Sequence, residues 1–189
     1  NETESGSQVD VRLAALDNGG FAAVWSDSGN DGSGYGIFGR RFDASGTAID
    51  ANDFQVNSAI SGTQADAGIT GLPDGGFIVT WTSASASGDT SSYGVAGQRF
   101  DASGNKIGTE FLVNTTTANQ QKYPYVTALD DGDFVVAWGS DLQAGDNSEL
   151  GVYAQRFASP IPFGTTTTTE HTVSTVTGST TGEAPFGSD

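Results

Sequence analysis

Short runs of alternating apolar and polar residues, separated by turns rich in Gly and Asp, fill the first 157 residues of the chain. Val, Ile, Phe, Tyr and Trp occupy most of the apolar positions, and these residue types suit strands of a half-buried sheet. No stretch of ten residues carries the apolar spacing of an amphipathic helix. The pattern therefore predicts an all-β protein.

The strand pattern repeats three times with a period of 56 to 58 residues. The segments LDNGGFAAVW, LPDGGFIVTW and LDDGDFVVAW each end in Trp, and a Gln stands 17 residues before each Trp. A third marker, an Arg-Phe pair, follows in the same register. The markers are Gln8, Gln64 and Gln121, Trp25, Trp81 and Trp138, and Arg41, Arg99 and Arg156. Such constant spacing predicts tandem structural repeats.

Each repeat predicts four short antiparallel strands, which in the first unit cover residues 9–16, 21–25, 36–42 and 54–56. The Asp/Asn-Gly pair between the first two strands is a strong hairpin signal. Four antiparallel strands in a unit of this length are typical of a β-propeller blade. We expect three such units, at about residues 8–63, 64–120 and 121–160.

Residues 161–189 form a tail rich in Thr, Gly and Ser, which predicts a linker or a disordered stalk. The alternative is that its segment from Thr168 to Thr177 supplies the fourth strand that the third repeat lacks. The chain also begins at Asn1, the position of the last residue of a fourth-strand motif, so we expect it to be part of something longer.

The repeated aromatic residues are predicted to form the core, with each Trp N–H bonded to a nearby carbonyl. They are Trp25, Trp81 and Trp138 with Phe21, Phe42, Phe77, Phe100, Phe134 and Phe157. Three blades do not close a ring, because propellers have about four to eight. Open strand edges invite pairing, so we expect self-association, further neighbouring repeats, or a smaller closed sandwich or barrel.

Charge and composition exclude several classes of protein. The chain has 23 acidic and seven basic residues, for a formal net charge of -16, which disfavours nucleic acid and anionic membranes as partners. It has no Cys, so disulfides and thiol chemistry are excluded, and no apolar run of membrane length.

The motif DGGF-x-V-x-W, followed by GQRFDASG and EF-x-VN, resembles a repeat of large secreted bacterial proteins of the RTX and adhesin type. The resemblance covers about residues 1 to 157 and implies export and a life at the cell surface or outside the cell. This sequence departs from the pattern at Asp133, in the loop after Trp81 and throughout the tail. The resemblance therefore does not imply the same role for all three repeats.

The loops that follow the first and third Trp are candidate Ca²⁺ sites. Clustered carboxylate and amide oxygens, with glycines that permit tight curvature, are what Ca²⁺ requires. The candidate ligands are Asp27, Asn30 and Asp31 in the first loop and Asp141, Asp146 and Asn147 in the third. The alternative is that these residues serve only as turn formers.

Three tyrosines, Tyr35, Tyr93 and Tyr123, stand in loops or at strand starts and are candidate ligand-binding aromatics. The repeated Arg residues are predicted to pair with a carboxylate such as Asp43 or Asp101 and so to fix a contact between blades. A ring of ligand-facing Arg residues is the alternative. The Asp residues of the hairpin turns are read as structural, because Asp-Gly supplies the backbone angles of such turns.

Catalysis finds little support in the sequence. His171 is the only His, and no nucleophile elbow, P-loop or dinucleotide motif is present. We therefore expect a non-catalytic structural or adhesive module of an exported bacterial protein, self-assembling or docked to other chains. A carbohydrate-binding module is the alternative, and a hydrolase that uses paired carboxylates is a third hypothesis.

Overall fold

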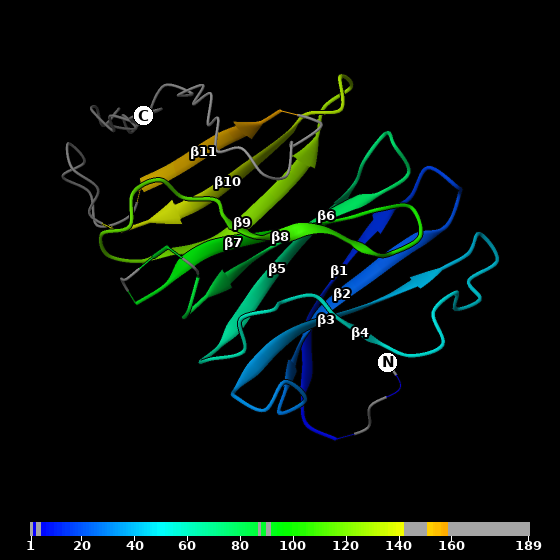
Figure 1. Cartoon of the computed structure of the whole chain (residues 1–189), viewed down its shortest axis with the longest axis horizontal. Helices are drawn as coiled ribbons and strands as arrows, with labels where there is room; N and C mark the ends of the chain where they lie inside the picture. The colour runs from blue at the N-terminus through cyan, green and yellow to red at the C-terminus, as the bar shows by residue number, and fades with distance from the viewer. Residues whose placement is uncertain (1, 3–4, 87, 90–91, 142–150, 159–189) are drawn as a thin grey trace, which may run out of the picture.

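The computed structural model describes residues 2, 5–86, 88–89, 92–141 and 151–158, which form eleven β-strands arranged in three antiparallel sheets (Figure 1). No helix occurs among these residues. Successive sheets lie side by side along the chain, as blades of a propeller do. The prediction of an all-β protein made of tandem, blade-like antiparallel units is confirmed.

Each blade is built from consecutive strands, with the first strand of the blade at one edge of its sheet. The first blade consists of β1 (Gln8–Ala15), β2 (Phe21–Ser28), β3 (Tyr35–Phe42) and β4 (Phe54–Gln55). The second consists of β5 (Gln64–Gly71), β6 (Phe77–Ser83), β7 (Gly94–Phe100) and β8 (Lys106–Leu112). The third consists of β9 (Gln121–Ala128), β10 (Phe134–Ser140) and β11 (Gly151–Phe157).

The third blade has three strands within the described part of the chain. The predicted tail, 161–189, and the strand proposed for Thr168 to Thr177 lie outside the described residues.

The hairpin turns that join the first two strands of each blade follow from the Asp/Asn-Gly sequence. The side chains of Asn18, Asp74 and Asp131 accept a hydrogen bond from the backbone N–H two residues ahead, at 2.9, 3.0 and 3.1 Å. The next residue, a Gly in each blade, has a positive φ of 81 to 89°, which residues with a side chain rarely adopt. The structural interpretation of these turn residues therefore agrees with the geometry.

The blades pack face to face, and the alternation of side chains in β6 divides the residues of this strand between two cores. Phe77, Val79 and Trp81 belong to the core shared with the first blade, whereas Ile78 belongs to the core shared with the third. Successive side chains of a strand point to opposite faces, so one strand can serve both interfaces. Because both its faces are covered, the second blade is the centre of the described molecule.

Buried Asn–Gln pairs join consecutive blades. Asn57 donates to the side chain of Gln64 at 3.1 Å, and Asn114 donates to that of Gln121 at 3.2 Å. Both glutamines are fully buried. The constant spacing of Asn and Gln in the sequence therefore has a physical cause: each Asn ends one blade and holds the first residue of the next.

Candidate functional site

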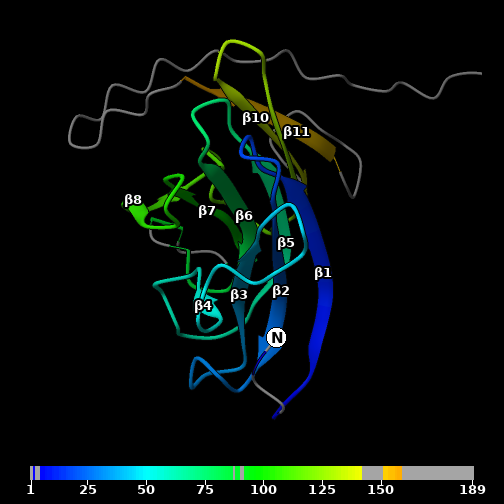
Figure 2. The same ribbon diagram turned by 90° about the vertical axis from the view of Figure 1, so that its right-hand side faces the viewer.

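The first strands of the three blades, β1, β5 and β9, lie next to one another, with β5 in contact with both of the others. In Figure 2, β1 and β5 lie toward one side of the molecule, and β4 and β8 lie toward the other. We call the surface formed by β1, β5 and β9 the first-strand face.

Each first strand carries a β-bulge at the same position of the repeat. The register shifts so that two residues of the first strand lie opposite one Trp of the second strand. The first residue of each bulge has a positive φ, at 56° for Asp10, 55° for Asp66 and 58° for Tyr123. This region is uncommon for residues with a side chain, and such strained positions cluster at binding and active sites. Bulges also redirect side chains, so these residues are candidates for function.

A hollow of about 140 Å³ opens on this face where β1, β5 and β9 meet. Its lining comes from three short segments, residues 12–13, 66–69 and 123–126. The close approach of β5 and β9 depends on Gly68, since a Cβ there would lie 3.0 Å from the carbonyl oxygen of Pro124. The bulge of β9 is anchored by its Tyr123 N–H, which donates to the Thr82 hydroxyl at 3.0 Å.

The hollow combines exposed aromatic rings with opposite charges. Tyr123 and Tyr125 are 57% and 70% exposed. Arg12 and Asp66 also line the hollow. The Arg12 guanidinium donates only to the neighbouring Val11 carbonyl, at 3.0 Å, and makes no ion pair within the described residues. Its remaining N–H groups are therefore available to a ligand.

Of the three tyrosines predicted to bind ligand, the structure places only Tyr123 in the hollow. Tyr35 begins β3, and Tyr93 is half-buried beneath Lys122, whose Nζ lies 4.1 Å from the ring centroid. Sequence reasoning missed Tyr125, Asp66 and Arg12. A usable signal was present for Tyr125, because the sequence Tyr-Pro-Tyr puts two aromatics around a buried Pro in a strand.

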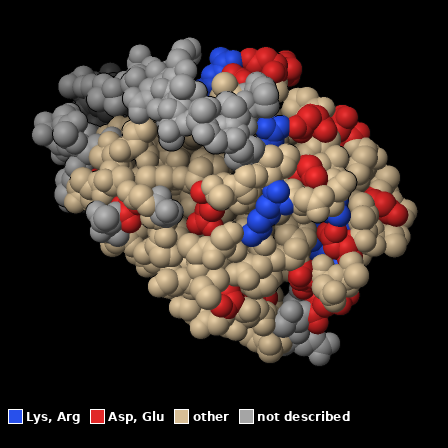
Figure 3. Space-filling model, in the orientation of Figure 1, with Lys and Arg blue, Asp and Glu red and all other residues tan. Residues whose placement is uncertain are grey.

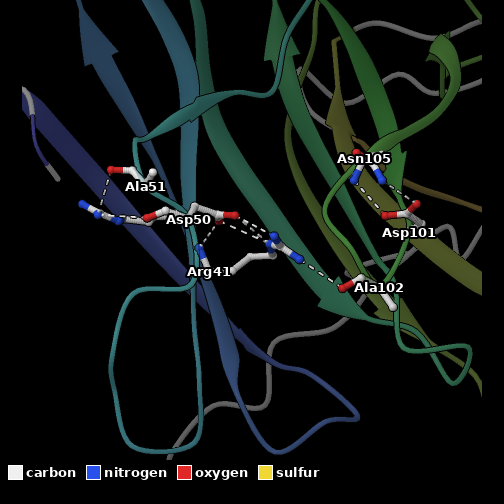
Figure 4. A network of polar contacts seen from close by, with 7 residues as sticks. Arg41, Asp50, Ala51, Asp101, Ala102 and Asn105 are labelled. Carbon is white, nitrogen blue, oxygen red and sulfur yellow. Dashed lines mark hydrogen bonds and ion pairs between the residues drawn. The ribbon is translucent and has the colours of Figure 1, made fainter.

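The repeated Arg residues make structural ion pairs, though with other partners than Asp43 or Asp101. Arg41 bonds Asp50 at 2.6 Å and donates to the Ala102 carbonyl of the second blade at 3.0 Å (Figure 4). The predicted contact between blades is thus made through a backbone carbonyl. Asp101 lies nearby, but its side chain accepts from Asn105 in its own turn.

In the other two blades the same Arg pairs with the hairpin turn of its own blade. Arg99 pairs with Asp74, and Arg156 pairs with Asp131 and, at 2.7 Å, with Asp133. The first blade has the uncharged Asn18 at this position of the turn, which explains why Arg41 turns to Asp50 instead. A second hollow, of about 250 Å³, lies between the turns of the second and third blades and is lined by two of these paired carboxylates.

The three Trp side chains lie in the core, with 6%, 0% and 5% of their surface exposed. Their position opposite the bulges makes them the support of the first-strand face. The predicted hydrogen bond to a carbonyl is wrong, because none of the three indole N–H groups has a partner within the described residues.

The predicted Ca²⁺ ligands of the first loop lie at the β2–β3 connection. Asp27 and Asp31 are buried, and Asp27 accepts a hydrogen bond from Asn30 at 2.5 Å. In the third loop, Asp141 is half-buried, and Asp146 and Asn147 lie outside the described residues. No group of three or more His, Cys, Asp or Glu side chains is placed to hold a metal ion in the described part of the chain.

Acidic side chains are scattered over the face shown in Figure 3, with few basic ones between them. No helix long and apolar enough to span a membrane occurs in the described ranges.

No family model and no curated protein matches the chain. Solved structures do resemble it in fold. An endo-1,4-beta-xylanase from Bacteroides thetaiotaomicron superposes with a TM-score of 0.51 and 12% identity over 82% of this chain. An endo-arabinase from the same organism has a TM-score of 0.49 and 15% identity over 83% of this chain. A thermostable family-43 glycoside hydrolase has a TM-score of 0.49 and 9% identity over 82% of this chain. The chain spans 56% of the xylanase, 58% of the arabinase and 56% of the family-43 enzyme.

These neighbours correct two predictions. The predictions of a self-assembling structural or adhesive module and of a chain that is not an enzyme are both contradicted by the fold, which the chain shares with a xylanase. An identity of 12% to the xylanase demonstrates a shared fold only. Function must therefore be argued from the chain's own residues.

Proposed function

We propose that the chain binds carbohydrate in the hollow of the first-strand face. The observation that carries this proposal is the pair of exposed rings, Tyr123 and Tyr125, beside Arg12 and Asp66. A sugar has apolar C–H faces and a rim of hydroxyl groups. Exposed aromatic rings offer a surface for the first, and a guanidinium with a carboxylate offers donors and acceptors for the second.

The fold shared with a xylanase supports this choice and suggests β-1,4-linked xylan as the first glycan to test. The resemblance of the repeat to that of exported bacterial proteins supports an extracellular setting for the interaction. The strong negative charge of the chain also favours a neutral glycan over a polyanion.

Isothermal titration with xylo-oligosaccharides, preceded by a screen on a glycan array, tests the proposal. Replacing Tyr125 by Ala should weaken binding by about tenfold or more, as loss of a main aromatic contact does at binding surfaces. Tyr35→Ala is the matched control, since Tyr35 lies on β3, away from the hollow. An array without any signal, or equal losses in the two variants, would contradict the proposal.

A second candidate function is glycoside hydrolysis, and a separate observation favours it. Asp10 and Asp66 occupy the same strained bulge position on two neighbouring first strands. Most glycoside hydrolases use two carboxylates that face each other across the scissile bond, about 5 to 10 Å apart. Here one of the two carboxylic acids would protonate the leaving oxygen while the other carboxylate assists water or attacks the sugar.

Release of reducing ends from xylan tests this second function. Asp10→Asn and Asp66→Asn should each abolish the release, whereas Asp43→Asn, in an exposed turn far along the repeat, should leave it unchanged. Binding without any turnover by the unaltered chain would leave carbohydrate binding as the function of this face and reject hydrolysis.

A further inference from the structure

The β2–β3 loop of the first blade holds two buried carboxylates that share one face of the sheet. Asp27 is 2% exposed and lies directly opposite Gly36 in the ladder of β2 and β3. Opposite residues of an antiparallel pair project to the same face, with Cβ atoms about 5 Å apart. The Asp31 carboxylate fills the place of the missing Gly36 side chain, because a Cβ on Gly36 would lie only 2.8 Å from Asp31 Oδ2. The two carboxylates are therefore neighbours.

No Lys or Arg side chain balances the charge of this pair. All seven Lys and Arg residues of the chain lie in the described ranges, and none forms an ion pair with Asp27 or Asp31. One oxygen of Asp31 accepts the Ser33 N–H at 2.9 Å, whereas the other, Oδ2, is buried without a hydrogen-bond partner within the described residues. Burying a carboxylate oxygen that has no hydrogen-bond partner is unfavourable.

In the second blade, the equivalent carboxylate has a hydrogen-bond donor and a neutral neighbour. Asp89 occupies the place of Asp31, with its Oδ2 at 2.6 Å from a Cβ built on Gly94. There the carboxylate accepts a hydrogen bond from Asn114 at 2.9 Å, and the residue opposite Gly94 is the neutral Ser83. The first blade thus adds one carboxylate, Asp27, and leaves the other without its amide donor.

We infer that the β2–β3 loop binds a hard divalent cation, Ca²⁺, between Asp27 and Asp31. Two carboxylates supply the charge, and the Asn30 amide, backbone carbonyls of the loop and water supply the neutral oxygens that complete a Ca²⁺ shell of six to eight ligands. The second blade lacks this site, since it has an amide and a serine in its place. It is separate from the first-strand face and does not depend on carbohydrate binding.

Thermal unfolding with Ca²⁺, and again with a chelator, tests this site in the unaltered chain. At a hundredfold excess of free Ca²⁺ over its Kd, the Tm should rise by about 5 to 10 °C. Asp27→Ser, which gives the loop the residue of the second blade, and Asp31→Asn should each abolish the rise. Asp89→Asn, the equivalent change in the second blade, should keep it.

Terbium luminescence gives a second readout that does not depend on stability. Tb³⁺ takes the same oxygen ligands, and Trp25 lies on the same face as Asp27, two residues away, and should sensitise its emission. Emission should appear with the unaltered chain and with Asp89→Asn and vanish with Asp27→Ser. The proposal is overturned if Ca²⁺ leaves the Tm unchanged, if Mg²⁺ raises it as much, or if the three variants respond alike.

Discussion

The first and second blades carry the same sequence motif in different surroundings. No residue of β5, the first strand of the second blade, is exposed, whereas β1, its counterpart in the first blade, is exposed along most of its length. The stacked rings Phe77 and Phe100 of the second blade are buried, but Phe21 and Phe42, their counterparts, are half-buried.

The difference comes from the neighbouring blade. The ring centroid of Phe54, in the first blade, lies 5.5 Å from that of Phe100 and completes a group of three rings in the second blade. In the same way, the ring centroid of Phe111, in the second blade, lies 5.6 Å from that of Phe157 in the third. No third ring from the described residues joins the pair Phe21 and Phe42. The motif therefore fixes the structure within a blade, while burial depends on the preceding blade, as in other repeat proteins.

The largest expected effect is a difference between Phe77→Ala and Phe21→Ala. Removing a fully buried Phe lowers the free energy of unfolding by about 3–5 kcal/mol, because the lost burial is joined by a cavity. Phe21→Ala should lower it by less than half as much, since part of that ring already faces solvent. Urea unfolding of the two variants measures both values, and equal losses would show that the neighbouring blade does not decide the burial.

An intermediate effect is expected at the Asn–Gln junctions. Asn57→Ala and Asn114→Ala each remove an acceptor for a buried backbone N–H, that of Ile37 or Val95, and a donor for the next Gln. Each change should lower the free energy of unfolding by about 1–3 kcal/mol.

The two junctions should differ by one further hydrogen bond. Asn114 also donates to Asp89, so its loss should cost about 1 kcal/mol more than that of Asn57. Asn105→Ala, in an exposed turn, is the control. A larger loss of unfolding free energy for Asn57→Ala than for Asn114→Ala would contradict a stabilising role for the hydrogen bond from Asn114 to Asp89.

The sequence allowed the fold to be predicted because the markers of the repeat are local. The Asp-Gly turns, the alternation of apolar residues and the spacing from Asn to Gln are each read from a few neighbouring residues. The hollow was not predictable in this way. Arg12, Asp66 and Tyr125 come from three different blades, and only the packing of β1, β5 and β9 brings them to one hollow.

The partners of charged side chains were also beyond the sequence. Arg41 was expected to reach Asp43 or Asp101, but Asp43 instead accepts from Ser45 and Thr47 in its own turn. Donors of the local turn compete with a more distant Arg for the oxygens of such a carboxylate, and here the local donors bind it. The bulge positions are a similar case, because Asp10, Asp66 and Tyr123 share a backbone angle without sharing a residue type.

The smallest expected effect concerns the turn carboxylates Asp43 and Asp101, equivalent residues of the first and second blades. A hydrogen bond from the Ser45 side chain is the main cause that lowers the pKa of Asp43, and one from the Asn105 side chain is the main cause for Asp101. A pKa lowered on folding adds stability above the ordinary value of 3.8 and loses it as pH falls through the folded value. Asp43→Asn and Asp101→Asn should therefore each flatten the fall of Tm with acidification below about pH 5.

The nearby charge of Arg41 also lowers the pKa of Asp101 but is not among the causes for Asp43. About 1 M NaCl should therefore reduce the effect of Asp101→Asn more than that of Asp43→Asn. If salt acts equally on both variants, Arg41 does not couple the first blade to the turn of the second electrostatically, and its contact with the second blade is limited to the hydrogen bond with Ala102.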